Sequence, residues 1–199
     1  KIIIARRVTK IFRFIPWIKL IGITGSLAVK NSEEKDDIDL FFITSDNRLL
    51  LTRALVVVIL RFLGLYRRPQ KIKDMICPNM FVSENELKIS PHNVFMAHEI
   101  CQLFPVFDRD NTYSKFLKKN LWVKEYLPNA TWDKNKEVGS EKKEARPPNY
   151  PLQGKELLMT NYLERPARIL QLWYMRKRKT TEVVEENLIK FHPHDIGPE

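Results

Sequence analysis

Residues 21–44 limit the possible folds of this chain more than any other stretch, because two apolar runs are joined there by a polar connection. Gly25 and Ser26 follow the first run, and Asp37 and Asp39 introduce the second. Because side chains alternate along a β-strand, residues two apart project to the same face. The stretch therefore predicts two strands, with both carboxylates on one face and apolar side chains on the other.

Asp37 and Asp39 predict a cation site. Two adjacent carboxylates in an otherwise apolar strand repel each other, and a divalent cation relieves that repulsion. Carboxylate oxygens are hard ligands that suit Mg²⁺ or Mn²⁺. The alternative is ordinary turn chemistry, since Asp also hydrogen-bonds its own backbone at the start of a strand.

Gly25 and Ser26 predict a phosphate site beside these carboxylates. Glycine tolerates positive φ and lets the backbone approach a ligand closely. Ser26 is expected to cap a short helix over Leu27–Lys30, whose first N–H groups would face an anion. A phosphate site next to paired carboxylates indicates a nucleoside triphosphate bound with its metal ion.

This stretch resembles the signature of the DNA polymerase β-type nucleotidyltransferase superfamily, and residues 17–44 carry the resemblance. Gly25, Ser26, Asp37 and Asp39 match that signature position by position. Later stretches are similar to uncharacterised prokaryotic nucleotidyltransferase-domain proteins: Ala97–Glu99, Phe107–Asp110 and Phe116–Asn129. The resemblance implies metal-dependent transfer of a nucleoside monophosphate from a nucleoside triphosphate to a hydroxyl acceptor.

The family generally carries a third catalytic carboxylate on a neighbouring strand. We expect Asp74 in that role, beside Asp37 and Asp39. The alternative is a surface acid at the strand edge, paired with Lys71 or Lys73. Asn79 and Glu84 follow in the same region, and an Asn79 at the third position would weaken metal binding. Glu99 is expected to be structural.

Two other functions stay open on the sequence. A missing third acid would favour a catalytically inactive nucleotidyltransferase-fold module that binds nucleotide, RNA or a partner protein. A basic RNA-binding or scaffold protein would instead rely on residues 173–179, where Trp173 and Tyr174 precede four consecutive cations. Clustered cations beside aromatic rings suit contacts to RNA, and they equally suit a solvated helix end.

The order of elements predicts an α+β protein with an α/β-type core. Residues 1–90 are expected to form a small mixed-sheet nucleotidyltransferase core, followed by a helical extension over 91–128. A flexible linker or loop is expected over 129–151, and a C-terminal helix and basic tail over 152–199. The expected helices are 1–15, 48–63, 94–104, 112–120, 121–126 and 152–175, and the expected strands are 17–24, 38–44, 75–82 and 87–89.

Composition limits the partners and the compartment. The formal net charge of +10 favours polyanions such as nucleotides, RNA or an acidic membrane surface. Cys77 and Cys101 lack metal-type spacing and predict buried free thiols, which indicates a reducing, cytoplasmic location. The longest apolar stretch, Leu49–Leu65, contains Arg53 and Arg61, so no transmembrane segment is expected.

Overall fold

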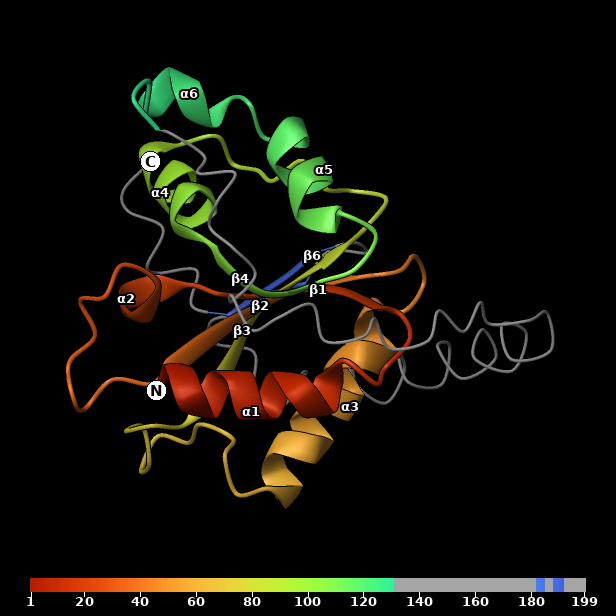
Figure 1. Ribbon diagram of the computed structural model, residues 1–199, viewed down its shortest axis with the longest axis vertical. Coiled ribbons are helices and arrows are strands. Elements are labelled where there is room, and N and C mark those ends of the chain that lie inside the picture. Colours follow the sequence, from red (N-terminus) through yellow and green to blue (C-terminus); the bar gives the residue numbers. More distant parts are fainter. Residues whose placement is uncertain (131–181, 185–187, 192–199) are drawn as a thin grey trace, which may run out of the picture.

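A mixed β-sheet organises the molecule, with helices on both of its faces (Figure 1). The structure is a computed structural model that describes residues 1–130, 182–184 and 188–191. The strands lie in the order β4-β1-β2-β3-β6-β5. Only β2 and β3 run parallel among the described pairs, and the other neighbours are antiparallel. The strands are β1 (Ile18–Ile23), β2 (Ile38–Thr44), β3 (Ile76–Ser83), β4 (Phe104–Asp108), β5 (Glu182–Val184) and β6 (Leu188–Phe191).

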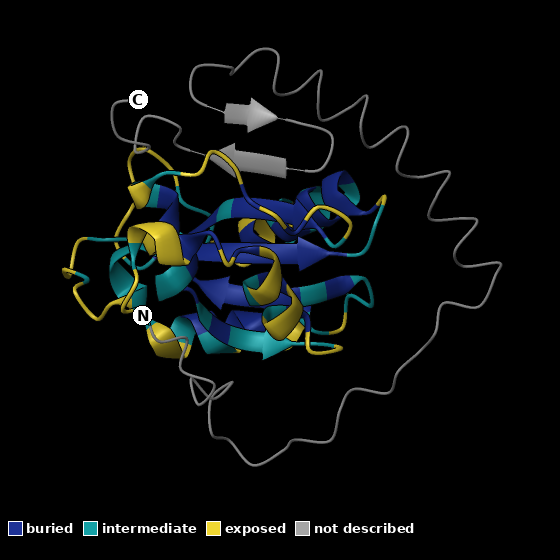
Figure 2. Ribbon diagram, turned by 90° about the horizontal axis from the view of Figure 1, so that it is seen from above, coloured by how far each residue is buried: buried dark blue, intermediate teal, exposed yellow. Residues whose placement is uncertain are grey.

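Two groups of helices cover the sheet. α1 (Ile2–Phe12) and α3 (Leu49–Phe62) lie on one face, and α4 (Val94–Gln102), α5 (Thr112–Lys119) and α6 (Val123–Tyr126) lie on the other (Figure 1). The short helix α2 (Gly25–Ala28) follows β1. The central strands are buried along most of their length (Figure 2). The sheet is therefore enclosed between two apolar cores.

Alternation along β2 divides its side chains between these cores. Ile38, Leu40 and Phe42 pack with α1 and α3, whereas Phe41 and Ile43 pack with α4, α5 and α6. Asp39 has the same parity as Phe41, so it lies on the α4 face of the sheet. This register is fixed because a slip by one residue would turn every apolar side chain to the wrong face.

The parallel pairing of β2 and β3 depends on α3, which returns the chain across the sheet. The sequence predicts that Asp46 or Asn47 caps the start of this helix and that Gly64 closes its end. Gly64 follows the helix with φ +68°. The predicted cap is wrong, because Arg48 occupies the N-cap and no side chain accepts a capping hydrogen bond there.

The α+β class and the first strands and helices are confirmed. Two local expectations are wrong. Residues 87–89 are not a strand, because the Asn120 side chain accepts from Ile89 N and donates to Leu87 O, which satisfies both backbone groups. The helix expected over 94–104 ends at Gln102, and Phe104 begins β4. Pro78 favours either an edge strand or a bulge, and the bulge is present in β3, which lies between β2 and β6.

The sheet includes strands from beyond residue 90. β4 pairs with β1, and β6 pairs with β3. Residues 182–184 and 188–191, expected within the C-terminal basic tail, form β5 and β6. The predicted linker falls almost entirely, and the predicted helix over 152–175 entirely, outside the described residues.

Candidate functional site

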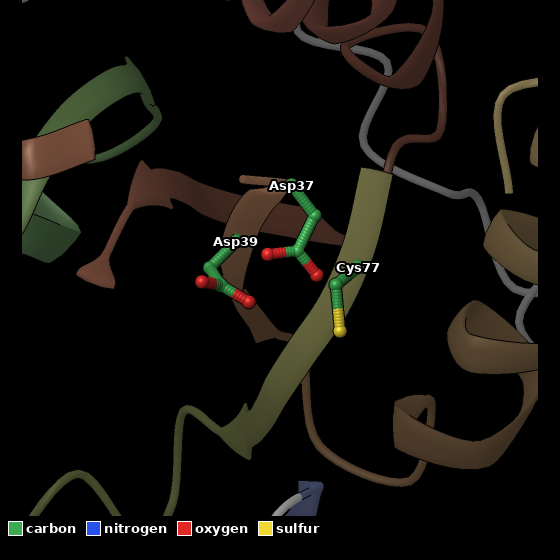
Figure 3. A group of neighbouring side chains, drawn as sticks. All are labelled: Asp37, Asp39 and Cys77. Carbon is green, nitrogen blue, oxygen red and sulfur yellow. The ribbon is translucent and has the colours of Figure 1, made fainter. Parts of the chain in front are cut away.

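Asp37 and Asp39 lie together where β2 begins. Their carboxylates are turned toward each other, with Cys77 of β3 beside them (Figure 3). One ligand atom from each of the three residues lies within 4.8 Å of the others. Asp39 pairs directly with Cys77 in the parallel register of β2 and β3. The predicted same-face arrangement of the two aspartates is therefore present.

Asp37 forms an ion pair with Arg67. The Nε atom of Arg67 lies 2.6 Å from Oδ2 of Asp37, and the two side chains are 32% and 18% exposed. Arg67 belongs to the connection between α3 and β3, where its backbone N donates to Ile76 O. The guanidinium therefore supplies positive charge to the carboxylate pair, and a metal ion on Asp37 would compete with it.

Gly25 contacts the second carboxylate. It adopts φ +65°, and a Cβ atom built on it would lie 2.7 Å from Oδ2 of Asp39. Thr24 N also donates to Asp39 O. Only glycine satisfies both the left-handed backbone and this close approach. The Gly-Ser turn and the aspartates, about ten residues apart in sequence, are thus in contact.

Ser26 has a different role from the predicted cap. The N-cap of α2 is Thr24, and Ser26 Oγ donates to Oδ2 of Asp36 over 3.1 Å. The same carboxylate oxygen accepts from Glu33 N at 2.8 Å. Asp36 therefore fixes the loop between α2 and β2, which holds Ser26 close to the paired aspartates.

Asp39 is the most strongly perturbed carboxyl of the site. Burial, the charge of Asp37 and the charge of Glu99 raise its pKa to about 7, and Arg67 opposes them. Burial also raises the pKa of the Cys77 thiol above its ordinary value. A carboxyl that resists ionisation beside a second carboxylate is the electrostatic setting in which a bound cation stabilises both charges.

Asp74 lies outside the group formed by Asp37, Asp39 and Cys77. It adopts φ +61° in the loop before β3, where its backbone N donates to Asp36 O. The β3 residue opposite Asp39 is Cys77 instead. Glu84 does not belong to this group either, and it forms an ion pair with Lys19.

Glu99, which is expected from the sequence to be structural, is a functional candidate. It projects from α4 toward a small pocket shared with Thr24 and Asn79, whose remaining walls are apolar. Its charge contributes to the raised pKa of Asp39. Thr24 Oγ1 is buried and has no hydrogen-bond partner among the described residues. Glu99 lies in one of the later stretches noted above, but no local spacing links it to the aspartates, because α4 is far from them along the chain.

The stretch Phe107–Asp110, noted above for its similarity, makes structural contacts. Arg109 donates to the carbonyl oxygens of Arg13 and Pro16 and so binds the end of α1. Asp108 accepts from Tyr113 N at the start of α5. The basic aromatic cluster at residues 173–179 lies outside the described residues.

The donor set fits a divalent cation. Two carboxylates lie close enough to share an ion, and one of them is destabilised by its surroundings while it remains bare. Carboxylate oxygens favour Mg²⁺ or Mn²⁺, whereas the Cys77 sulfur would favour softer ions. Arg67 is the competing cation within the same group.

Comparison with protein-family models, curated protein sequences and solved structures gave no match to this chain. Across the described residues, every helix is too short or too polar to cross a bilayer.

Proposed function

We propose that this protein transfers a nucleoside monophosphate from a nucleoside triphosphate to a hydroxyl acceptor, with release of pyrophosphate. The observation that supports the proposal is the contact between the Gly25 turn and the paired carboxylates of Asp37 and Asp39. A phosphate-binding turn and a metal-binding pair must meet in this way to hold one metal–triphosphate ligand.

The residues would divide the work by their chemistry. Asp37 and Asp39 would hold Mg²⁺ or Mn²⁺, and Gly25 and Ser26 would border the phosphates. A bound divalent ion lowers the pKa of an attacking hydroxyl and neutralises charge on the leaving pyrophosphate. The acceptor oxygen bonds to the α-phosphorus, and the bond from that phosphorus to the pyrophosphate oxygen breaks. Arg67 would move from Asp37 and could then neutralise phosphate charge.

Glu99 is our preferred third carboxylate. It extends from α4 into the pocket that Thr24 also lines, and its negative charge raises the pKa of Asp39. A carboxylate in this position can accept the proton that leaves the attacking hydroxyl. Asp74, the expected third acid, stays a prediction without a contact to the pair.

Two observations favour a second function, a catalytically inactive module that binds nucleotide, RNA or a partner. The Asp37–Arg67 ion pair already compensates one carboxylate, and Cys77 stands where a third acid would complete the metal site. In that case the protein would bind a nucleoside triphosphate without consuming it. RNA as partner or acceptor, and a cytoplasmic location, remain predictions from composition.

The deciding experiment measures pyrophosphate release from each of the four ribonucleoside triphosphates, with Mg²⁺ or Mn²⁺ and cellular RNA or protein as acceptor. The full chain should release pyrophosphate and label an acceptor with the nucleotide α-phosphate. Asp39→Asn should abolish both signals, while Asp36→Asn should retain them because the Asn amide oxygen can still accept from Ser26 Oγ and Glu33 N. Binding of triphosphate without turnover would favour the inactive module.

A further inference from the structure

Large apolar side chains are exposed on the side of the molecule formed by α1 and α3. Phe62 is 90% exposed, Phe14 71%, Ile3 67% and Val58 62%. Both helices cover the same face of the sheet, so their outward surfaces belong to one side of the molecule (Figure 1). Several large apolar groups exposed on one side indicate an interaction surface, whereas single exposed residues do not.

The buried residues of α1 explain which side chains are left outside. Ala5, Val8, Thr9 and Phe12 face the sheet. The opposite surface presents Ile3, Arg7, Lys10, Ile11 and Phe14, which recur at helical spacing and are all exposed. This outer surface therefore alternates cations with large apolar groups, whereas an ordinary solvated helix surface carries polar residues there.

The sequence segments that form this side contain basic residues and no acidic ones. Residues 1–16 and 48–73, which contain α1, α3 and the connection to β3, include no Asp or Glu. They carry five and seven Lys or Arg residues, respectively. Arg48 and Arg53 are buried, and Lys73 pairs with Glu34 of the α2–β2 loop. Apart from Lys73, the exposed cations of this side are Arg7, Lys10, Arg61, Arg68 and Lys71. The surface is thus matched to a negatively charged partner.

We propose that the α1–α3 side docks on an anionic lipid bilayer. Cations attract phospholipid headgroups, and apolar side chains between them insert at the boundary of the acyl chains. A nucleic acid would satisfy the cations but leave Phe14, Phe62 and Ile3 exposed to water. In this arrangement the α1–α3 side lies on the membrane surface.

The test is co-sedimentation of the full chain with vesicles of phosphatidylcholine alone or with about 30% phosphatidylserine. Binding should be stronger to the anionic vesicles by roughly tenfold or more, and should weaken as salt increases. Arg7→Gln with Lys10→Gln should reduce the preference for anionic vesicles. Phe14→Ser with Phe62→Ser should weaken binding at least about tenfold, because two inserted rings are lost.

A matched control comes from the opposite side of the sheet. Val94 and Leu121 are each 54% exposed on the side of α4 and α5. Val94→Ser with Leu121→Ser removes comparable exposed apolar groups and should leave vesicle binding unchanged. Since all four substituted side chains are exposed, circular dichroism should show the same fold in the Phe14/Phe62 and Val94/Leu121 variants.

Three results would overturn the proposal. Equal affinity for neutral and anionic vesicles would remove the role of the cations. An equal loss of vesicle binding in the Phe14/Phe62 variant and the Val94/Leu121 variant would show that the α1–α3 side is not the docking surface. A dimer in sedimentation velocity that Phe14→Ser with Phe62→Ser dissociates would show that a second copy of the chain covers this side.

Discussion

Arg67 places its Nε atom 2.6 Å from Oδ2 of Asp37, so a cation of the protein itself holds one of the two paired carboxylates. The same group contains Asp39, whose pKa is raised by burial and by the neighbouring acids. In the metal-free protein, the charge of the pair is therefore compensated in two ways. Arg67 neutralises Asp37, and protonation relieves Asp39. A divalent cation would have to replace both.

Replacing Arg67 by Gln should strengthen metal binding. The guanidinium and the ion compete for Asp37, so Mn²⁺ affinity without nucleotide should rise roughly three- to tenfold. Isothermal titration calorimetry provides the measurement. Arg68→Gln, which removes a neighbouring exposed cation, should change affinity much less. Unchanged Mn²⁺ affinity in Arg67→Gln would show that Arg67 does not compete with the ion.

Replacing Asp39 by Asn should change how the free energy of unfolding depends on pH. The folded-state pKa of Asp39 is about 7, above its ordinary value of 3.8, so the folded protein binds a proton that the unfolded chain releases. Stability from this group is therefore present at low pH and is lost as pH rises toward 7. Asp39→Asn should stabilise the metal-free protein at pH 8 by on the order of 1–3 kcal/mol.

Asp36→Asn is the control for that measurement, and its expected effect on stability has the opposite sign. Bonds from Glu33 N and Ser26 Oγ hold the pKa of Asp36 below its ordinary value. Its contribution is therefore present above that ordinary value and is lost as pH falls. Thermal melts across pH should show Asp36→Asn losing stability at neutral pH, where Asp39→Asn gains it. A loss of stability in Asp39→Asn would mean that the carboxylate serves the fold.

Two glycines separate backbone strain from contact with the site. Gly25 and Gly64 adopt nearly the same left-handed backbone, with φ +65° and +68°. A Cβ on Gly64 would meet nothing within 4 Å, whereas one on Gly25 would meet Asp39. Both Ala variants should lose about 1–2 kcal/mol of stability from strain. Only Gly25→Ala should also lower nucleotidyl transfer, by roughly tenfold or more, because Asp39 is displaced.

Equal activity of the two glycine variants would contradict this account of the turn. Chemical denaturation gives their stabilities, and the pyrophosphate assay gives their activities. Activity is measured well below the unfolding transition, so that differences in folded fraction do not contribute.

The third carboxylate can be identified by comparing two neutral variants. Glu99→Gln should lower the transfer rate by about 100-fold or more, because a proton acceptor or metal ligand is lost. Asp74→Asn should stay within about threefold of the unchanged protein, since Asp74 lies outside the group. Both retain side-chain shape, and thermal melts check their folding. The reverse order of effects would restore the role first expected for Asp74.

The sequence predicted the elements whose patterns are local. Alternation in residues 38–44 placed Asp37 and Asp39 on one face, and Gly64 marked the end of α3. The sequence did not predict β4 or β6, because strand pairing depends on partners far along the chain. Cys77 and Glu99 were missed at the site for the same reason. Each reaches the aspartates from a different element, and short-range spacing contains no record of that contact.

Mn²⁺ binding, followed by electron paramagnetic resonance, tests most directly whether Asp37 and Asp39 hold the metal of a bound triphosphate. The full chain should bind Mn²⁺ more tightly when a nucleoside triphosphate is present. Asp37→Asn and Asp39→Asn should each weaken that binding by roughly 100-fold, whereas Asp74→Asn should not. Unchanged Mn²⁺ binding in both aspartate variants would contradict the central claim, because the paired carboxylates would then have no part in metal binding.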